Sequence, residues 1–122
     1  MYSPYKSKGG FSRLLSALRY SIQGLIIAVK HEAAFRQELI LAVVLTPVAL
    51  WISENVFEAV LLIGSLLFVL IIELLNSALE AVADTITIDH HPMIGRAKDL
   101  GSAAVLLSLT MASLIWIGVI LA

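Results

Sequence analysis

Hydrophobic and polar positions alternate with a helical period along the first quarter of the chain. The apolar members, at intervals of three, four and seven, are Phe11, Leu14, Leu15, Leu18, Ile22, Leu25, Ile26 and Val29. This spacing places them on one face of a helix and puts polar and basic side chains on the other. Beside apolar spans, such a helix typically lies in the membrane interface. The pattern predicts a flexible N-terminus over residues 1–10 and a surface helix over 11–32. Packing against protein is the alternative for that helix.

Three long apolar runs follow the amphipathic segment. The first, residues 39–52, is shorter than the roughly 20 residues that cross a bilayer as a helix, so its helix should begin near residue 33. The second run predicts a helix over residues 56–84, and the third predicts one over residues 100–121, with a loop over 85–99 between them. The predicted fold class is an all-α membrane protein, in one domain, with an N-terminal amphipathic surface helix and three transmembrane helices.

Composition supports the membrane class and excludes others. Of 122 residues, 60% are hydrophobic and only 14% are charged. A soluble domain of this size could not bury so much apolar surface. The chain has no cysteine, which excludes disulfides and thiolate chemistry.

The distribution of charge predicts the orientation in the membrane. Six of the eight basic residues precede the first apolar run, and the other two, Arg96 and Lys98, lie in the 85–99 loop. The loop between the first two spans holds Glu54 and Glu58 but no Lys or Arg. Because basic residues favour the cytoplasmic side, we expect the N-terminus and the 85–99 loop in the cytoplasm. The C-terminus should then lie outside.

Polar side chains share one face at the end of the second span. With about 100° between successive helical residues, this face holds Glu73, Asn76, Ser77, Glu80 and Asp84. An acidic side chain at the centre of a membrane helix costs roughly 2.5–3.5 kcal/mol on insertion scales. A solvated helix end would account for Asp84 more easily than for Glu73. The pattern favours a site that needs acceptor oxygens: a metal site, a proton relay or acid–base chemistry.

The candidate residues narrow the chemistry without deciding it. The sequence has no Walker motif, no glycine-rich dinucleotide fingerprint and no Ser/His/Asp triad pattern. His90 and His91 are adjacent, so they would not share a helix face as zinc ligands. Carboxylates suit Mg²⁺, which often bridges one or two acids and substrate phosphates. The candidate ligands are Glu32, Glu73, Glu80 and Asp84, and the candidate phosphate contacts are Arg13, Arg96 and Lys98. A Mg²⁺–phosphate site at the cytoplasmic surface and a proton-coupled transporter subunit with Glu73 as relay both remain open.

Three blocks of sequence resemble the prokaryotic diacylglycerol kinase family. They are Glu-Ala-Ala-Phe-Arg-Gln-Glu (32–38), Glu-Leu-Leu-Asn-Ser-Ala-Leu-Glu-Ala-Val-Ala-Asp (73–84) and Gly-Arg-Ala-Lys-Asp-Leu-Gly-Ser-Ala-Ala-Val-Leu (95–106). The resemblance implies a homotrimer in the bacterial inner membrane, with active sites between subunits at the cytoplasmic side. It also implies ATP- and Mg²⁺-dependent phosphorylation of diacylglycerol to phosphatidic acid, which feeds phospholipid recycling, and no nucleic-acid partner. Undecaprenol, phosphorylated by other members of the family, is the alternative acceptor.

The resemblance also implies roles for individual residues. Glu73 would be the catalytic base, Asn76 would help to hold the catalytic site, and Glu32 and Glu80 would bind the metal. The implied ATP contacts are Arg13, Tyr20, Glu32, Glu80, Asp89, His91, Lys98 and Asp99. The implied lipid contacts are Arg13, Glu73 and Ser102, with Asp84 in a supporting position. The chain departs from the family at Asp89-His90-His91, where Glu-Tyr-His is common.

Overall fold

The computed structural model describes residues 9–86 and 91–122, and within these ranges the chain is helical without any strand. Its helices are α1 (Gly10–His31), α2 (Ala33–Ile52), α3 (Val56–Ile86) and α4 (Pro92–Leu121). The predicted all-α fold class is confirmed. Asp89 and His90 lie outside the described residues, as does most of the expected flexible N-terminus.

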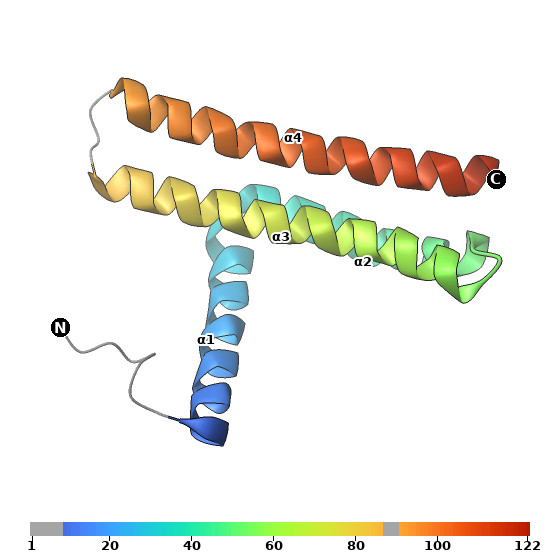
Figure 1. Cartoon of the computed structure of the whole chain (residues 1–122), viewed down its shortest axis with the longest axis horizontal. Helices are drawn as coiled ribbons and strands as arrows, with labels where there is room; N and C mark the ends of the chain where they lie inside the picture. Colours follow the sequence, from blue (N-terminus) through green and yellow to red (C-terminus); the bar gives the residue numbers. More distant parts are fainter. Residues whose placement is uncertain (1–8, 87–90) are drawn as a thin grey trace.

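The helices α2, α3 and α4 form a three-helix membrane domain. They contain 20, 31 and 30 residues, and each is long and apolar enough to cross a bilayer. In Figure 1, α3 and α4 run side by side in opposite directions and α2 lies behind α3. α1 runs crosswise to them, and the ends of α3 and α4 that flank residues 87–90 extend past it. If α1 lies on the membrane surface, those two ends reach into water.

The third apolar helix begins earlier than its hydropathy suggested. α4 starts at Pro92, so residues 92–99 of the expected loop are helical. Proline suits the first helical position, where a missing N–H costs nothing. The preceding residue, His91, caps the helix, because its Nδ1 accepts a hydrogen bond from the backbone N–H of Met93 at 3.1 Å. Local capping therefore sets this boundary, which hydrophobicity alone does not reveal.

The apolar face of α1 is left uncovered by the rest of the chain. Only Ala28 is buried in this helix, whereas the predicted stripe from Phe11 to Val29 is exposed. Lys30 and His31 occupy the last turn. An uncovered apolar face beside three spanning helices is what a helix in the membrane interface presents to the lipid.

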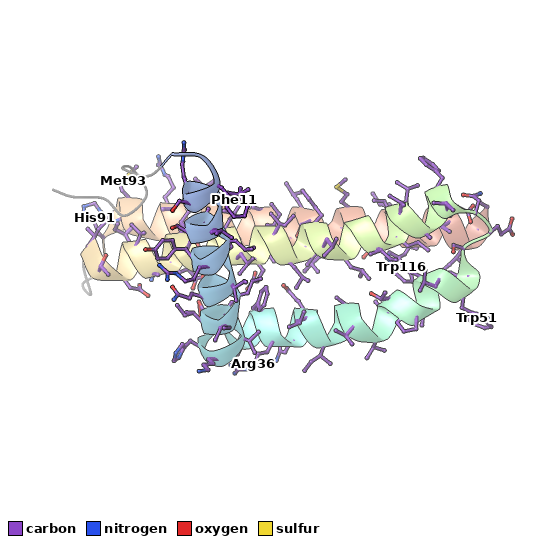
Figure 2. All side chains as sticks on the ribbon, turned by 90° about the horizontal axis from the view of Figure 1, so that it is seen from below. Phe11, Arg36, Trp51, His91, Met93 and Trp116 are labelled. Carbon is purple, nitrogen blue, oxygen red and sulfur yellow. The ribbon has the colours of Figure 1, made fainter. Side chains whose placement is uncertain are left out.

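A single extended residue makes the elbow between α1 and α2. Glu32 has φ −113° and ψ 104° and so interrupts the helix. The last carbonyls of a helix lack helical partners, and here Nη1 of Arg36 donates to the carbonyl oxygens of Val29 and Lys30, both at 3.0 Å. Arg36 marks this corner in Figure 2. The elbow turns the chain from the crosswise direction into the bundle, and it leaves Glu32 at the corner.

A hydrogen bond joins α3 and α4 within the apolar half of the bundle. The indole Nε1 of Trp116 donates to Oγ of Ser65 at 3.0 Å. Ser65 is buried, and its hydroxyl donates in turn to the carbonyl of Leu62 at 2.7 Å. Interhelical hydrogen bonds of this type help to fix the register of membrane helices.

Replacing Trp116 by phenylalanine tests this contact. The Trp116→Phe variant keeps a large aromatic side chain and loses the donor, so the free energy of unfolding should fall by about 1 kcal/mol. The measurement is reversible denaturation in mixed detergent–SDS micelles. Trp51→Phe is the matched control, because Trp51 is 83% exposed. Equal stability of the two variants would contradict a contribution from the Trp116–Ser65 bond.

Candidate functional site

On the polar face of α3, Glu73 points into the protein, whereas Glu80 and Asp84 further along are exposed. Glu73 is only 5% exposed, whereas Leu75 and Val82 on the opposite face are 63% and 61% exposed. In a membrane the exposed apolar residues meet lipid chains, which removes the need to bury them in protein. The buried position of Glu73 requires a different explanation, because a carboxylate loses hydration there.

Glu73 belongs to a group of four acids, called the acidic cluster below: Glu32, Glu38, Glu73 and Glu80. Glu32 at the elbow and Glu80 one turn along from Asn76 are close enough to repel the Glu73 carboxylate electrostatically. Glu38 of α2 lies close enough to Glu73 for the Glu73 charge to act on it. Within the described residues, Glu73 accepts no hydrogen bond, and Oε2 of Glu38 is buried without a partner. Four acids that lie near one another form a site that favours positive charge.

Two polar contacts order the side chains next to the acidic cluster. Nδ2 of Asn76 donates to Oε1 of Glu80 at 2.9 Å. One turn further along α3, Oδ1 of Asp84 accepts from Nζ of Lys98 at 2.7 Å, which ties α3 to α4. The Lys98 and Asp84 side chains are 42% and 64% exposed, so a ligand phosphate could reach Lys98.

A cavity of about 700 Å³ lies between α1 and α3, beside the acidic cluster. Its walls are mostly apolar, with Leu25 and Ala28 from α1 and Leu74 and Ala78 from α3. Glu32 and Ser77 lie among its lining residues. This size is in the range of ligand pockets in proteins, and an apolar wall with a polar edge suits an amphiphilic molecule.

The structure does not gather all of the predicted site residues in one chain. Ser102 and Asp99 are exposed on α4. Asp99 lines a shallow groove on that helix together with Arg96 and Pro92. Arg13 is exposed near the start of α1, about 28 Å along the helix from Glu32 at 1.5 Å per residue.

Three predicted nucleotide contacts remain to be placed: Tyr20, His91 and Asp89. The guanidinium of Arg19 lies 5.7 Å from the ring centre of Tyr20, within the range of a cation–π contact. His91 caps α4 through Nδ1, and Asp89 is outside the described residues.

The carboxylates present fit a magnesium ion that arrives with a phosphate ligand. Within residues 9–86 and 91–122, no three His, Asp or Glu side chains converge closely enough to hold a metal ion by themselves. Mg²⁺ commonly takes only one or two protein carboxylates and completes its shell with substrate phosphates and water. Glu80, oriented by Asn76, and Glu32, placed by the elbow, are donors of that kind.

Sequence comparison decides the family. The family model for prokaryotic diacylglycerol kinase matches residues 19–120. This chain belongs to the prokaryotic diacylglycerol kinase family. It is similar to a Pseudomonas aeruginosa protein named diacylglycerol kinase, with 44% identity over 98% of this chain and 97% of the relative. Proteins of that name from Haemophilus influenzae and Escherichia coli K12 are 43% and 46% identical, over 95% and 88% of this chain and 98% and 88% of theirs.

Membership of this family confirms the expected enzyme class, a kinase embedded in a membrane. Sequence reasoning missed Glu38 as a neighbour of Glu73, because the two residues come from different helices. The only sequence signal for Glu38 was its position as an acid at the start of an apolar run.

Replacing Glu38 by glutamine tests the repulsion within the acidic cluster. Glu38→Gln keeps the shape and removes a charge opposite Glu73, so the unfolding temperature in detergent should rise by a few degrees, equivalent to about 1 kcal/mol. Glu54→Gln is the control, since Glu54 is exposed at the opposite end of the bundle. A fall in stability would mean that the Glu38 carboxylate has a favourable partner in the assembled protein.

Proposed function

We propose that this protein transfers the γ-phosphoryl group of ATP to the free hydroxyl of diacylglycerol, giving phosphatidic acid and ADP. The observation that carries the proposal is the buried Glu73 carboxylate, held among other acids beside an amphiphilic cavity. Membership of the diacylglycerol kinase family supports the same reaction. The reaction feeds phospholipid recycling, since phosphatidic acid is a phospholipid precursor.

Glu73 is the proposed base. A base must lie within hydrogen-bond reach of the proton that it takes, and Glu73 makes no hydrogen bond within the described residues that would compete for its oxygens. Its carboxylate accepts the hydroxyl proton as the lipid oxygen bonds to the γ-phosphorus. The bond from that phosphorus to the β–γ bridging oxygen breaks, and ADP leaves. A base at this depth lets the lipid keep its acyl chains in the membrane.

Glu32 and Glu80 are the proposed metal ligands. Mg²⁺ bound with the nucleotide would neutralise phosphate charge, which is the main requirement of phosphoryl transfer. The Asn76 amide orients Glu80 for this role. Lys98 is the proposed contact to the phosphates, and Asp84 holds it in place until the nucleotide arrives. Asp89, His91 and Asp99 remain proposed nucleotide contacts.

The proposed active form is a homotrimer with its sites between subunits. Arg13 and Tyr20 are proposed to meet the nucleotide, yet Arg13 lies about 28 Å along α1 from Glu32. One chain therefore cannot place Arg13 and Glu32 on the same phosphate group. A neighbouring copy can supply Arg13 from its own α1, and Ser102 on the outer side of α4 can face the lipid in the same arrangement.

The proposed location is the bacterial inner membrane, with the N-terminus in the cytoplasm and the C-terminus outside. The acidic cluster, the basic end of α1 and Lys98 lie at one end of the bundle, where ATP must be present. The positive-inside rule assigns this end to the cytoplasm.

A phosphate-transfer assay tests the proposed function. The full-length protein is supplied with γ-³²P-ATP in mixed micelles, with diacylglycerol and undecaprenol in separate reactions, each with and without Mg²⁺. Label in phosphatidic acid that depends on Mg²⁺ is the expected result. Label only in undecaprenyl phosphate would change the acceptor, and no label in either from a folded oligomer would reject the kinase function.

Removing the acidity of Glu73 tests its role as the base. Glu73→Gln should lower kcat by at least about 100-fold, the typical contribution of a general base, and should leave the oligomer folded. Glu58→Gln is the matched control at the other end of α3, because glutamine retains the oxygen that accepts from the N–H of Glu54. Near-normal turnover in Glu73→Gln would exclude Glu73 as the base.

Glu80→Gln tests metal binding. Loss of one anionic ligand should raise the Mg²⁺ concentration that gives half-maximal activity about 10-fold or more, while the KM for diacylglycerol stays the same. The measurement is a Mg²⁺ titration at fixed ATP. An unchanged titration curve would place the metal elsewhere.

A further inference from the structure

Gly101 lies where α4 comes closest to the polar face of α3. It is buried, and a Cβ built on it would collide with Oδ1 of Asn76 and would lie 3.4 Å from Cγ of Asn76 and 3.8 Å from Cδ2 of Leu79. At Gly24, Gly64, Gly95 and Gly118, a built Cβ meets nothing within 4 Å. Among the described helix-interior glycines, Gly101 is therefore the one at which a neighbouring side chain occupies the space that a Cβ would take.

The neighbour that fills this space has only one possible orientation. A carboxylate accepts hydrogen bonds and cannot donate them, so the contact with Oε1 of Glu80 at 2.9 Å must come from Nδ2 of Asn76. Oδ1 of Asn76 must then point toward α4. It is buried and accepts no conventional hydrogen bond. What it faces is the Cα–H of Gly101, a weak donor that recurs at close helix contacts.

We propose that Gly101 is a positioning residue of the phosphoryl-transfer site, which acts through Asn76 on Glu80. The bare Cα admits the Asn76 amide between α3 and α4, and the trapped amide holds the Glu80 carboxylate in one orientation. The inference rests on the proposed function for the identity of the ligand, the metal–nucleotide complex. The geometry of the Gly101–Asn76–Glu80 chain does not rest on it.

A methyl group at position 101 would break this chain of contacts. The Asn76 side chain would have to turn away, since its collision with the added Cβ involves the amide oxygen itself. Turning the amide withdraws Nδ2 from Glu80. Residues that orient a metal ligand typically contribute 10–100-fold to metal affinity. Glu80 would remain in place but lose its fixed direction.

The direct test compares Gly101→Ala with Gly118→Ala, an alanine substitution in the same helix at a site with open space. The probe is Mn²⁺ binding in the presence of adenylyl imidodiphosphate, followed by electron paramagnetic resonance of free Mn²⁺. Gly101→Ala should weaken Mn²⁺ binding about 10-fold, with the KM for diacylglycerol unchanged. Gly118→Ala should match the wild type. Equal Mn²⁺ affinity in both variants would overturn the proposal.

A double-mutant cycle separates positioning from packing. In an Asn76→Ala background the added methyl group meets no amide, so Gly101→Ala should cause no further loss of Mn²⁺ affinity. The same loss in both backgrounds would show that Gly101 acts on helix packing alone and would overturn the proposal. The Asn76 side-chain ¹⁵N–¹H signals should shift in Gly101→Ala; unchanged signals would also overturn it. Absence of Mn²⁺–nucleotide binding by the wild type, with those signals shifted, would instead reject the proposed function.

Discussion

The structure depends on keeping carboxylates where water is scarce. Glu73 is almost fully buried, and Glu32, Glu38 and Glu80 act on it as like charges or lie beside it. Burial and repulsion both disfavour such a group in the absence of a cation. A ligand that carries positive charge would stabilise the ionised form of Glu73, and that form can take a proton from a substrate. In the proposed reaction, the Mg²⁺–nucleotide and the lipid hydroxyl fill these two roles.

The crosswise α1 makes this arrangement compatible with a membrane. Its uncovered apolar face can lie on the lipid surface. The elbow at the end of α1 then brings the Glu32 carboxylate near Glu73. The Arg36 guanidinium donates hydrogen bonds to two of the last carbonyl oxygens of α1, so these carbonyls at the corner have partners without an additional segment of chain. Beyond the elbow, the ends of α3 and α4 extend past α1 (Figure 1), and Glu80, Asp84 and Lys98 belong to these parts of the two helices. In the proposed reaction, lipid and nucleotide approach the same acids from opposite sides.

Contacts between α3 and α4 differ in kind along their length. Trp116 and Ser65 join the helices within the apolar half, and Lys98 and Asp84 join them at the opposite end. Between these points Gly101 permits the Asn76 amide to enter. Membrane helices lack a hydrophobic force that would draw them together, so small residues and hydrogen bonds decide their approach. The same contacts that pack the helices therefore also orient the polar groups of the site.

Hydropathy and periodicity by themselves determined the helical class, the three spans and the shared face of Glu73, Asn76, Glu80 and Asp84. These properties depend on intervals along one chain, which a helix converts directly into faces and lengths. Hydropathy did not place the start of α4, because Pro92 and the His91 cap set it locally. Only the tertiary structure brought Glu38 opposite Glu73 and Gly101 against Asn76, since each pair comes from separate helices. Which residues meet across helices depends on their rotation and close approach, and the pattern within a single helix does not specify which residue of another helix lies opposite.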